Sequence, residues 1–458
     1  GLGEKMEIIS KSYLSIYNFF PEYLLSILMT FSQCFSKPNF VYFKAYVWSM
    51  MINTSRKCMT NTAQTCFFLG KNISSFERFL SENKWDIHLV RQKLVELILI
   101  KLYPYLMIHG ALLAVFDTTL AEKSGDEMLG TQRWHNSTGT ADKRTSVYAH
   151  HWGIVGLVCS HAIRFICFPV LAVLIPGNIN QQQWISGPQG TRPMNFWDAS
   201  LAGLYELQSY LPAFIRLRVV ADAYFSKVPF IQGLRSKCIH LISRLRKNAK
   251  GWDSSVPIPA NERRRGRPRK KGKEWKLSDL PKHFPSEPVD VWLYGKMKSL
   301  HVLVRDVFLR DYDELVRVVI IQTATSSIML MSTDLSLSAK QIIEIYGSRF
   351  SIELSIRDMK QHFGFADYQC YSTIAFFRFV SLSCVSYVLW MLTLLESQDE
   401  FLSDASSSSF HSESPLSFLR LKRVFKRFVC KQIIFSKFSN HANFEKIDSE
   451  IEPLLQMV

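Results

Sequence analysis

The chain has 458 residues, of which 47% are hydrophobic, so it can fill two or three separate cores. Its 55 Lys and Arg residues against 39 Asp and Glu residues give a formal net charge of +16, which favours a polyanion such as nucleic acid as the partner. The nine cysteines include no C-x-x-C pair and mostly lie in apolar runs, which excludes a cysteine zinc site or a disulfide framework and indicates reduced core residues of a cytosolic protein.

Residues 1–105 are rich in aromatic and aliphatic side chains at helical spacing, which predicts an all-α N-terminal domain. Ser74 precedes Glu77 by three positions, the spacing of a capping box that would open one of these helices. We expect this domain to bind DNA, with a helix-turn-helix as one way of doing so, although its charge pattern alone does not establish that motif.

Two aspartates follow short apolar runs in residues 106–250, where apolar runs alternate with helical stretches as in an α/β domain. Leu112–Phe116 leads directly into Asp117, and Arg216–Ala221 leads directly into Asp222. Short apolar runs are typical of buried strands, and a carboxylate at the end of a buried strand lies at the sheet edge, where it can meet solvent and a ligand. Taken singly, each aspartate is better explained as a turn residue or a helix cap.

Other apolar segments of this domain are also expected to be strands: Ile154–Val158, Ile166–Leu174 and Cys238–Ile242. The first two lie within the apolar stretch Gly153–Pro176, which His161 and Arg164 interrupt, so paired strands are favoured over a membrane span. The adjacent imidazoles of His150 and His151 lack a second spaced pair of ligands, so packing or DNA contact is favoured over a metal site.

An insertion is expected between Asp222 and Glu353, because the 131 positions that separate them greatly exceed one strand–helix connection. Residues 251–337 would form it, beginning with a basic linker and continuing as a β-rich subdomain. The expected strands of this subdomain are Val291–Tyr294, Leu300–Val307, Val316–Gln322 and Ser327–Met331.

The basic linker contains nine basic residues and one acidic residue within Arg263–Lys276. The run Arg-Gly-Arg-Pro-Arg within it is similar to the core of an AT-hook, so Arg265, Arg267 and Arg269 are candidate DNA-binding residues. Pro268 keeps the backbone extended and the neighbouring glycine lets it lie close to DNA, so that Arg side chains can enter a narrow minor groove. A disordered basic linker that binds phosphates without recognising sequence is an equally good alternative.

The segment from Tyr346 to Lys360 carries the spacing Y-x-x-R-x-x-x-E-x-x-x-x-x-x-K, in which Arg349 and Glu353 are the second and third fixed positions. At about 100° per residue, a continuous helix would gather these four side chains on one face. A carboxylate flanked by cations suits phosphodiester chemistry, because the carboxylate can hold a metal ion and the cations can hold phosphate. The alternative is a solvated face on which Glu353 pairs with Arg349 and Arg357.

Residues 338–400 are expected to form the last helices of the same α/β domain. Ser338 and Gln341 have the spacing of a capping box that would open the first of them. Gly347 would interrupt the helix early, which makes the placement of the tyrosine less secure, whereas Gly364 is well placed to end it.

These segments together resemble DDE-type insertion-sequence transposases, whose Y-R-E-K signature matches at all four fixed positions. Val115–Gly125 and Val219–Phe225 resemble the same superfamily in the same order, and the resemblance extends from about residue 74 to about residue 365. Phe350 departs from the pattern, since the family usually has Trp there. A stacking role would survive that change, but an indole hydrogen bond would not. The resemblance implies an α/β, ribonuclease-H-like catalytic domain with a β-rich insertion.

The resemblance also assigns roles to particular side chains. It makes three carboxylates catalytic: Asp117, Asp222 and Glu353. Three acidic oxygen ligands suit two Mg²⁺ ions, with Mn²⁺ as a substitute. Arg349 and Lys360 would hold backbone phosphates, and Tyr346 would hydrogen-bond a phosphate near the cut.

We therefore expect a DNA transposase that cuts element ends and joins them to target DNA, with cut-and-paste movement as the family resemblance suggests. Its partners would be double-stranded DNA, as terminal inverted repeats and as target, and a second copy of the chain in a homodimeric synaptic complex. No secretory signal is evident, so we expect it in the cytoplasm, at a bacterial nucleoid. One alternative is a ribonuclease-H-like nuclease that cuts without joining. A second is a catalytically silent AT-hook DNA-binding protein, and the three carboxylates argue against this second alternative.

The C-terminal part begins with an apolar stretch, Ala375–Leu395, of membrane-spanning length with only Arg378 charged. A helix that is apolar all round is also typical of a large protein core, and a helix that covers the catalytic domain is favoured, with no membrane partner. Residues 401–458 are expected to be a basic helical tail, in which a serine-rich linker precedes Arg420–Arg427, a basic amphipathic run that could bind DNA or a second subunit.

Overall fold

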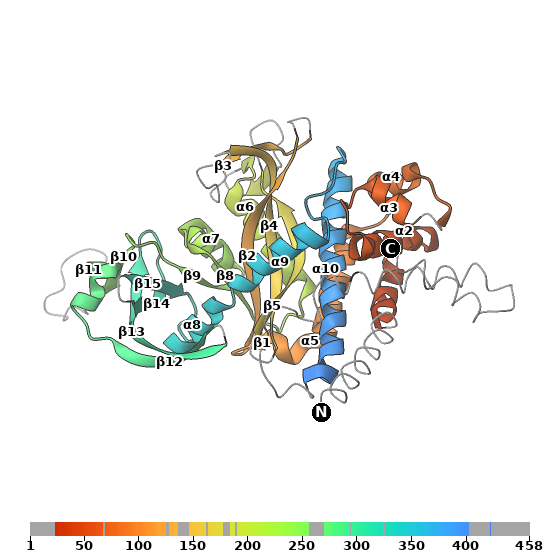
Figure 1. Cartoon of the computed structure of the whole chain (residues 1–458). Coiled ribbons are helices and arrows are strands. Elements are labelled where there is room, and N and C mark those ends of the chain that lie inside the picture. Colours follow the sequence, from red (N-terminus) through yellow and green to blue (C-terminus); the bar gives the residue numbers. More distant parts are fainter. Residues whose placement is uncertain are drawn as a thin grey trace, which may run out of the picture. The chain divides into compact units, whose positions relative to one another are not determined.

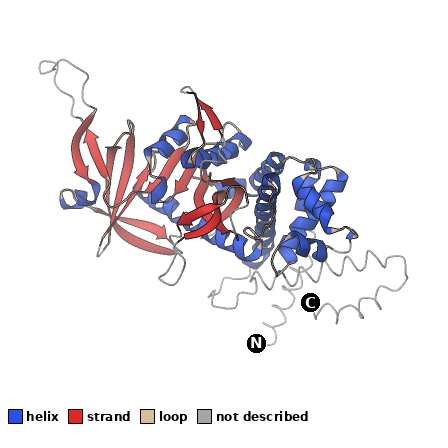
Figure 2. Cartoon of the chain, turned by 90° about the horizontal axis from the view of Figure 1, so that it is seen from above, coloured by secondary structure: helices blue, strands red, loops and turns tan. Residues whose placement is uncertain are grey.

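The computed structural model describes residues 23–66, 69–124, 128–135, 146–161, 164–176, 184–187, 190–255, 270–293, 295–323, 326–402 and 422. The chain forms two compact units that are not contiguous in sequence. The first unit draws on residues 1–98, 121–149 and 356–458, and the second on residues 99–120 and 150–355. Figure 2 distinguishes the helix-rich first unit from the strand-rich second unit by colour. The expected division into five consecutive domains stays a prediction.

The first unit is mainly helical in its described part. Its elements are η1 (Thr30–Cys34), α2 (Lys37–Ile52), α3 (Met59–Thr65), α4 (Ile73–Ser81), α5 (Ile87–Leu106, which continues into the second unit), β3 (Gln132–His135) and α10 (Thr373–Leu402). α10 packs against α2 and α4. The aromatic rings of Phe43, Tyr46 and Phe79 are fully buried in this unit, so aromatic burial holds the helices together.

The N-terminus of α4 differs from the expected capping box. Asn72 is the N-cap, and its side chain accepts a hydrogen bond from the backbone N–H of Ser75. The prediction that Ser74 and Glu77 would cap this helix was wrong, because Ser74 already lies inside it. Asn is as good an N-cap as Ser, and Asn72 stands where the chain leaves its extended conformation.

The long apolar helix of the C-terminal part lies in the interior of the first unit. Thr373–Glu396 is long and apolar enough to cross a membrane, but 83% of its most apolar window is buried inside the protein. Its arginine, Arg378, donates hydrogen bonds to the carbonyl oxygens of Leu80, Asn83 and Trp85. A buried charge with partners of this kind is typical of a core helix, as expected for this segment.

The second unit is built on a mixed sheet (Figure 1). Its first strands and helices are β1 (Met107–Ile108), β2 (Ala111–Glu122, which continues into the first unit), β4 (Ser146–His161, which begins there), β5 (Arg164–Leu174), α6 (Phe196–Tyr210), β8 (Leu217–Ala221), η4 (Ala223–Phe225), α7 (Val228–Ser236) and β9 (His240–Arg244). A small separate hairpin consists of β6 (Trp184–Gly187) and β7 (Gly190–Pro193). In the sheet, these strands follow the order β5-β4-β2-β8-β9. β2, β8 and β9 are parallel, whereas β4 and β5 are antiparallel.

The strands expected in this region are confirmed, with one change of boundary. β4 and β5 pair over most of their length, as the interrupted apolar stretch predicted. The third expected strand, Cys238–Ile242, begins two residues later, at His240. Cys238 has a left-handed backbone (φ 59°), so it belongs to the turn that precedes the strand.

In the described residues between β9 and the next α-helix there are six strands. They are β10 (Lys250–Ser254), β11 (Lys271–Lys276), β12 (Glu287–Leu293), β13 (Lys296–Leu309), β14 (Leu315–Gln322) and β15 (Ser327–Ser332), with the short helix η6 (Leu277–Lys282) after β11. β15 pairs with β9, so the sheet continues through β14, β13 and β10 to β11. The four strands expected from sequence are confirmed as parts of β12 to β15, except that Tyr294, the last residue of the first one, lies outside the described residues.

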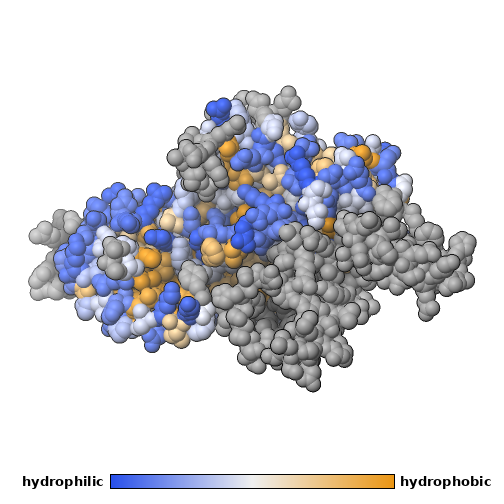
Figure 3. All heavy atoms as spheres, in the orientation of Figure 1, coloured by the Kyte–Doolittle hydropathy of each residue, from blue (hydrophilic) through white to orange (hydrophobic). Residues whose placement is uncertain are grey.

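Two helices, α8 (Ala339–Gly347) and α9 (Phe350–His362, which continues into the first unit), follow β15. α8 packs against β12 and β15 (Figure 1). Its expected capping box is confirmed, because Ser338 accepts from the N–H of Gln341 and Gln341 accepts from the N–H of Ser338. In the face drawn in Figure 3, hydrophilic side chains surround a small apolar area near β14, β15 and α8.

Candidate active site

Asp117 and Asp222 lie side by side in the sheet of the second unit. β2 and β8 are parallel neighbours, and the residues that precede the two aspartates, Phe116 and Ala221, are register partners. The expected convergence of the two carboxylates is therefore confirmed. The sequence predicted that this strand would end at Asp117, but β2 continues to Glu122. It continues because β4 pairs with it along its other edge, while β8 ends and leaves the edge beside Asp117 open.

Local hydrogen bonds hold both aspartates. The Asp117 carboxylate accepts the backbone N–H of Thr118 at 2.8 Å. The Asp222 carboxylate accepts the backbone N–H of Tyr224 at 2.9 Å and so caps η4. The simpler explanation of Asp222 as a helix cap is therefore correct. A cap uses one carboxylate oxygen, so capping leaves room for a second role through the other oxygen.

The helix that was expected to carry Tyr346, Arg349 and Glu353 is broken. α8 ends at Gly347 and α9 begins at Phe350, so the tyrosine lies in the last turn of α8 and the glutamate in the first turn of α9. The interruption at Gly347 that the sequence indicated is confirmed, so the four side chains do not share one continuous helix. Turn hydrogen bonds such as Arg349 N–H to Tyr346 O keep the chain compact across the break. Glycine is a poor interior residue for a helix, which favours the end at Gly347.

Arg349 bridges two of the candidate carboxylates. Its Nη2 lies 2.5 Å from Glu353 Oε1, and its Nη1 lies 3.6 Å from Asp117 Oδ2. The pairing with Glu353 is the one that the solvated-face alternative predicted, but the Arg349 side chain is only 20% exposed and also faces Asp117. The other partner that this alternative predicted, Arg357, pairs instead with Asp358. The Glu353 side chain is 41% exposed, so this helix face is a charge cluster that is only partly buried.

The protonation of Asp117 depends on its burial and on the charges around it. Burial raises the pKa of Asp117 to about 6, and the negative charges of Asp222 and Glu353 add to the shift, whereas Thr118 and Arg349 oppose it. Asp117 therefore lies within electrostatic range of both other carboxylates. Such a cluster needs positive charge nearby, and Arg349 supplies it in this structure.

Tyr346 belongs to the same cluster. Burial raises the pKa of its hydroxyl, and the charge of Arg349 opposes that shift. The hydroxyl therefore stays a neutral hydrogen-bond donor at neutral pH. Its distance in sequence from Glu353 does not separate it from the site, because Asp222 also acts electrostatically on it.

The other candidate DNA-binding residues are placed differently. Lys360 lies near the end of α9 in the first unit, where burial lowers the pKa of its ammonium group and Glu122 opposes the shift. The AT-hook residues Arg265, Arg267 and Arg269 lie outside the described residues, as does most of the C-terminal tail. Their roles stay predictions.

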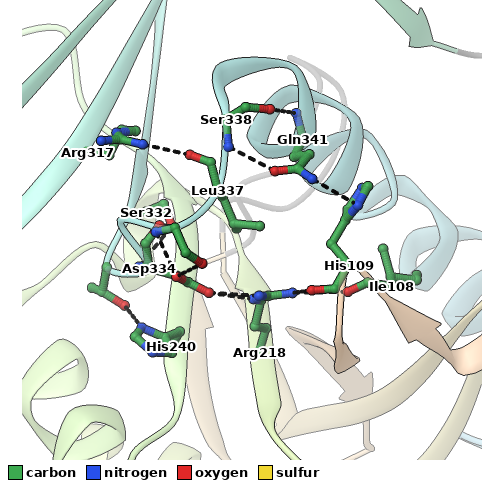
Figure 4. Close-up of polar contacts among 12 residues, drawn as sticks. Ile108, His109, Arg218, His240, Arg317, Ser332, Asp334, Leu337, Ser338 and Gln341 are labelled. Atoms are coloured by element: carbon green, nitrogen blue, oxygen red, sulfur yellow. Dashed lines mark hydrogen bonds and ion pairs between the residues drawn. The ribbon is translucent and has the colours of Figure 1, made fainter.

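Arg218 was missed from sequence as a candidate of any kind. It lies in β8, is only 5% exposed, and donates to Asp334 Oδ2 and to the carbonyl oxygens of Ile108 and His109 (Figure 4). Asp334 stands between β15 and α8, so this ion pair connects the end of the insertion to the strand that carries Asp222. In the sequence, the sign of this role was one arginine within the otherwise apolar run Leu217–Ala221.

A second set of contacts holds the same connection. The Gln341 side chain contacts the ring of His109, and Arg317 donates to the carbonyl oxygen of Leu337 (Figure 4). Side-chain hydrogen bonds therefore fix the link from β15 to α8 to β8 and β14, and the first turn of α8 to the turn between β1 and β2. This link leads directly to Arg349 and Glu353, so it contributes to their position in the second unit.

The donor set of the cluster fits a hard divalent cation, since it consists of carboxylate oxygens that repel one another. Within the described part of the chain, however, no three His, Cys, Asp or Glu side chains are gathered closely enough to hold one metal ion. The side chains of Asp117 and Glu353 contact Arg349 instead. Metal binding would therefore require Arg349 to release these two carboxylates.

Comparison with protein families identifies the class of protein. The model of the DDE superfamily endonuclease family matches residues 30–287, more than half of the chain, so the chain belongs to that family. The transposase DDE domain matches residues 207–389, which confirms the resemblance to DDE-type transposases. No curated protein shows significant similarity to the chain. Nucleases of this superfamily generally use divalent metals and act on DNA.

Proposed function

We propose that the chain is a DNA transposase that cuts the ends of its element and joins them to target DNA. The observation that carries this proposal is the pairing of Asp117 and Asp222 at neighbouring positions of parallel strands, with Glu353 within electrostatic range. The sheet order β5-β4-β2-β8-β9, in which β2, β8 and β9 are parallel and β4 and β5 are antiparallel to each other, supports a ribonuclease-H-like catalytic domain. The strands β10 to β15 would be the β-rich insertion into that domain.

Asp117, Asp222 and Glu353 would hold two Mg²⁺ ions, or Mn²⁺ in their place, which would activate a water molecule and stabilise the departing 3′ oxygen. The chain's own residues would position the DNA. Arg349 would leave the carboxylates for a backbone phosphate, where its planar fork can form two hydrogen bonds. Tyr346 would donate its hydroxyl proton to a phosphate near the cut, and Lys360 would add a point charge, which completes the Y-R-E-K signature.

The wider assignment follows from the same proposal. The partners would be terminal inverted repeats and target DNA, with two copies of the chain in the synaptic complex, acting at a bacterial nucleoid in the cytoplasm. The helical residues 1–105 and the arginines at 265, 267 and 269 would add DNA affinity outside the catalytic site. Movement would be of the cut-and-paste kind.

Two assays test the proposal. Strand transfer with pre-cut element ends should join them to a target plasmid in the presence of Mg²⁺, and intact ends should be cut under the same conditions. Cleavage without joining would identify a nuclease. Binding without cleavage in Mg²⁺ or Mn²⁺ would identify a silent DNA-binding protein, despite the three carboxylates.

A further inference from the structure

An exposed aromatic ring lies beside one of the candidate catalytic carboxylates. Tyr224 is 46% exposed and stands two residues after Asp222, whose carboxylate accepts its backbone N–H at 2.9 Å. The cap on η4 therefore fixes the tyrosine backbone to the aspartate. Capping needs only this backbone group, so it does not explain a large ring left in solvent.

The ring of Tyr224 rests on a second aromatic side chain. Trp197, at the N-terminus of α6, stacks against it with ring centroids 5.5 Å apart and an interplanar angle of 23°. Phe196 meets it edge to face at 5.3 Å. Phe225 also meets the ring edge to face at 5.6 Å, and Tyr224 nevertheless keeps 46% of its surface exposed.

This pair is anchored in the core of the second unit. Trp197 contacts Phe225 at 6.2 Å and Phe230 at 6.1 Å between ring centroids, and both phenylalanines are buried. α6 itself begins at a capping box formed by Asn195 and Asp198, which fixes the backbone that carries Trp197. The outer ring is thus held in place before any ligand binds, which reduces the entropy lost on binding.

We infer that Tyr224, supported by Trp197, is a platform on which an unpaired nucleobase stacks next to the phosphate that is cut. An exposed aromatic face binds any base through stacking, since every base has a π-face. The neighbouring Asp222 belongs to the candidate cluster, and the exposed Lys227 lies three residues beyond Tyr224, where its charge suits a flanking phosphate. This inference rests on the proposed function, because only DNA bound at Asp222 brings a base to the ring.

The test uses the full chain in EDTA, so that no result depends on cleavage. Two DNA probes carry the fluorescent base 2-aminopurine, one in a forked end where the base is unpaired and one in a fully paired duplex. We expect the wild-type chain to bind the forked probe roughly five- to 150-fold more tightly and to quench its fluorescence by stacking. Tyr224→Leu should lose both the preference and the quenching, whereas Tyr224→Trp should keep them.

The matched control is Phe214→Leu, which removes a ring that is 77% exposed in the same unit but precedes the opposite end of β8. It should keep the preference. The inference is overturned if Tyr224→Leu still prefers the forked probe, if Phe214→Leu loses as much, or if the wild-type chain binds both probes equally. Failure of the wild-type chain to bind either probe would overturn the proposed function as well.

Discussion

Arg218 and Asp334 form a buried ion pair in which the guanidinium donates through Nε and Nη2 to one carboxylate oxygen, both at 2.8 Å. Burial alone would raise the pKa of Asp334, but hydrogen bonds from Ser336 and Arg218 bring it down to about 2. The remaining Nη1 of Arg218 donates to the carbonyl oxygens of Ile108 and His109. One side chain thus joins three segments that are distant in sequence.

Replacing Arg218 with Met should reduce the free energy of unfolding by about 3–5 kcal/mol, because Asp334 would be left as a buried charge without its partner. Denaturant unfolding measures this directly. Lys250→Met is the matched control, since the pair of Lys250 and Glu274 is exposed on both sides and should contribute less than about 1 kcal/mol. A loss for Arg218→Met as small as that of the control would contradict the role assigned to this ion pair.

The three carboxylates should each be needed for cleavage. Asp117→Asn, Asp222→Asn and Glu353→Gln keep the side-chain shape but withdraw a negative charge, so each should reduce Mg²⁺-dependent cleavage by at least about 100-fold. DNA binding, measured by gel shift, should stay close to that of the wild-type chain. A variant that cleaves at the wild-type rate would remove its residue from the proposed site.

Arg349 and Lys360 should contribute to the salt dependence of DNA binding. If each contacts a phosphate, Arg349→Ala and Lys360→Ala should each reduce the log–log slope of affinity against salt concentration by about one. Arg357→Ala is a suitable control, because Arg357 is more exposed and pairs with Asp358. Slopes that match the control in both variants would support cations that merely neutralise the carboxylates.

Asp117 should make the metal-free protein less stable as the pH rises. Its pKa is about 6 in the folded chain against 3.8 for the free side chain, so the protonated form is favoured by folding. Stability from this group is present below about pH 4 and is lost as the pH rises through about 6. Asp117→Asn should therefore raise the Tm in EDTA at pH 7.5 but not at pH 4. The exposed Asp290→Asn should show no such difference, and an equal Tm gain at both pH values would refute the assignment.

The basic linker should add affinity and a preference for A·T-rich DNA. Lys271 begins β11, so a deletion through that residue would remove part of a strand, and substitution is the cleaner change. Changing Arg265, Arg267 and Arg269 to Ala should weaken binding and remove the A·T preference. Netropsin, which occupies the minor groove, should compete with the wild-type chain but not with this variant. Equal competition would mean that the linker responds to charge alone.

The sequence by itself was sufficient for the paired aspartates. Buried parallel strands are apolar along their whole length, so the polar residue that follows Leu112–Phe116 or Arg216–Ala221 marks the place where a ligand can approach. Four of the six described strands of the insertion and the capping box at Ser338 were also predictable from local patterns, whereas β10 and β11 were not, and β11 (Lys271–Lys276) lies at the end of the expected basic linker. Each predicted feature depends on a pattern within a few neighbouring residues, and such patterns are visible in one dimension.

The tertiary structure decided everything that depends on residues distant in sequence. The break between α8 and α9 changes which atoms Arg349 can contact. The proximity of Arg349 to Asp117 depends on the packing of α8 against the sheet. Arg218 has a buried ion-pair partner within its strand because Asp334 lies opposite it, more than a hundred residues away. The stacking of Tyr224 depends likewise on Trp197, which is distant in sequence. Burial and ion pairing are properties of the folded neighbourhood, so no local pattern could have specified them.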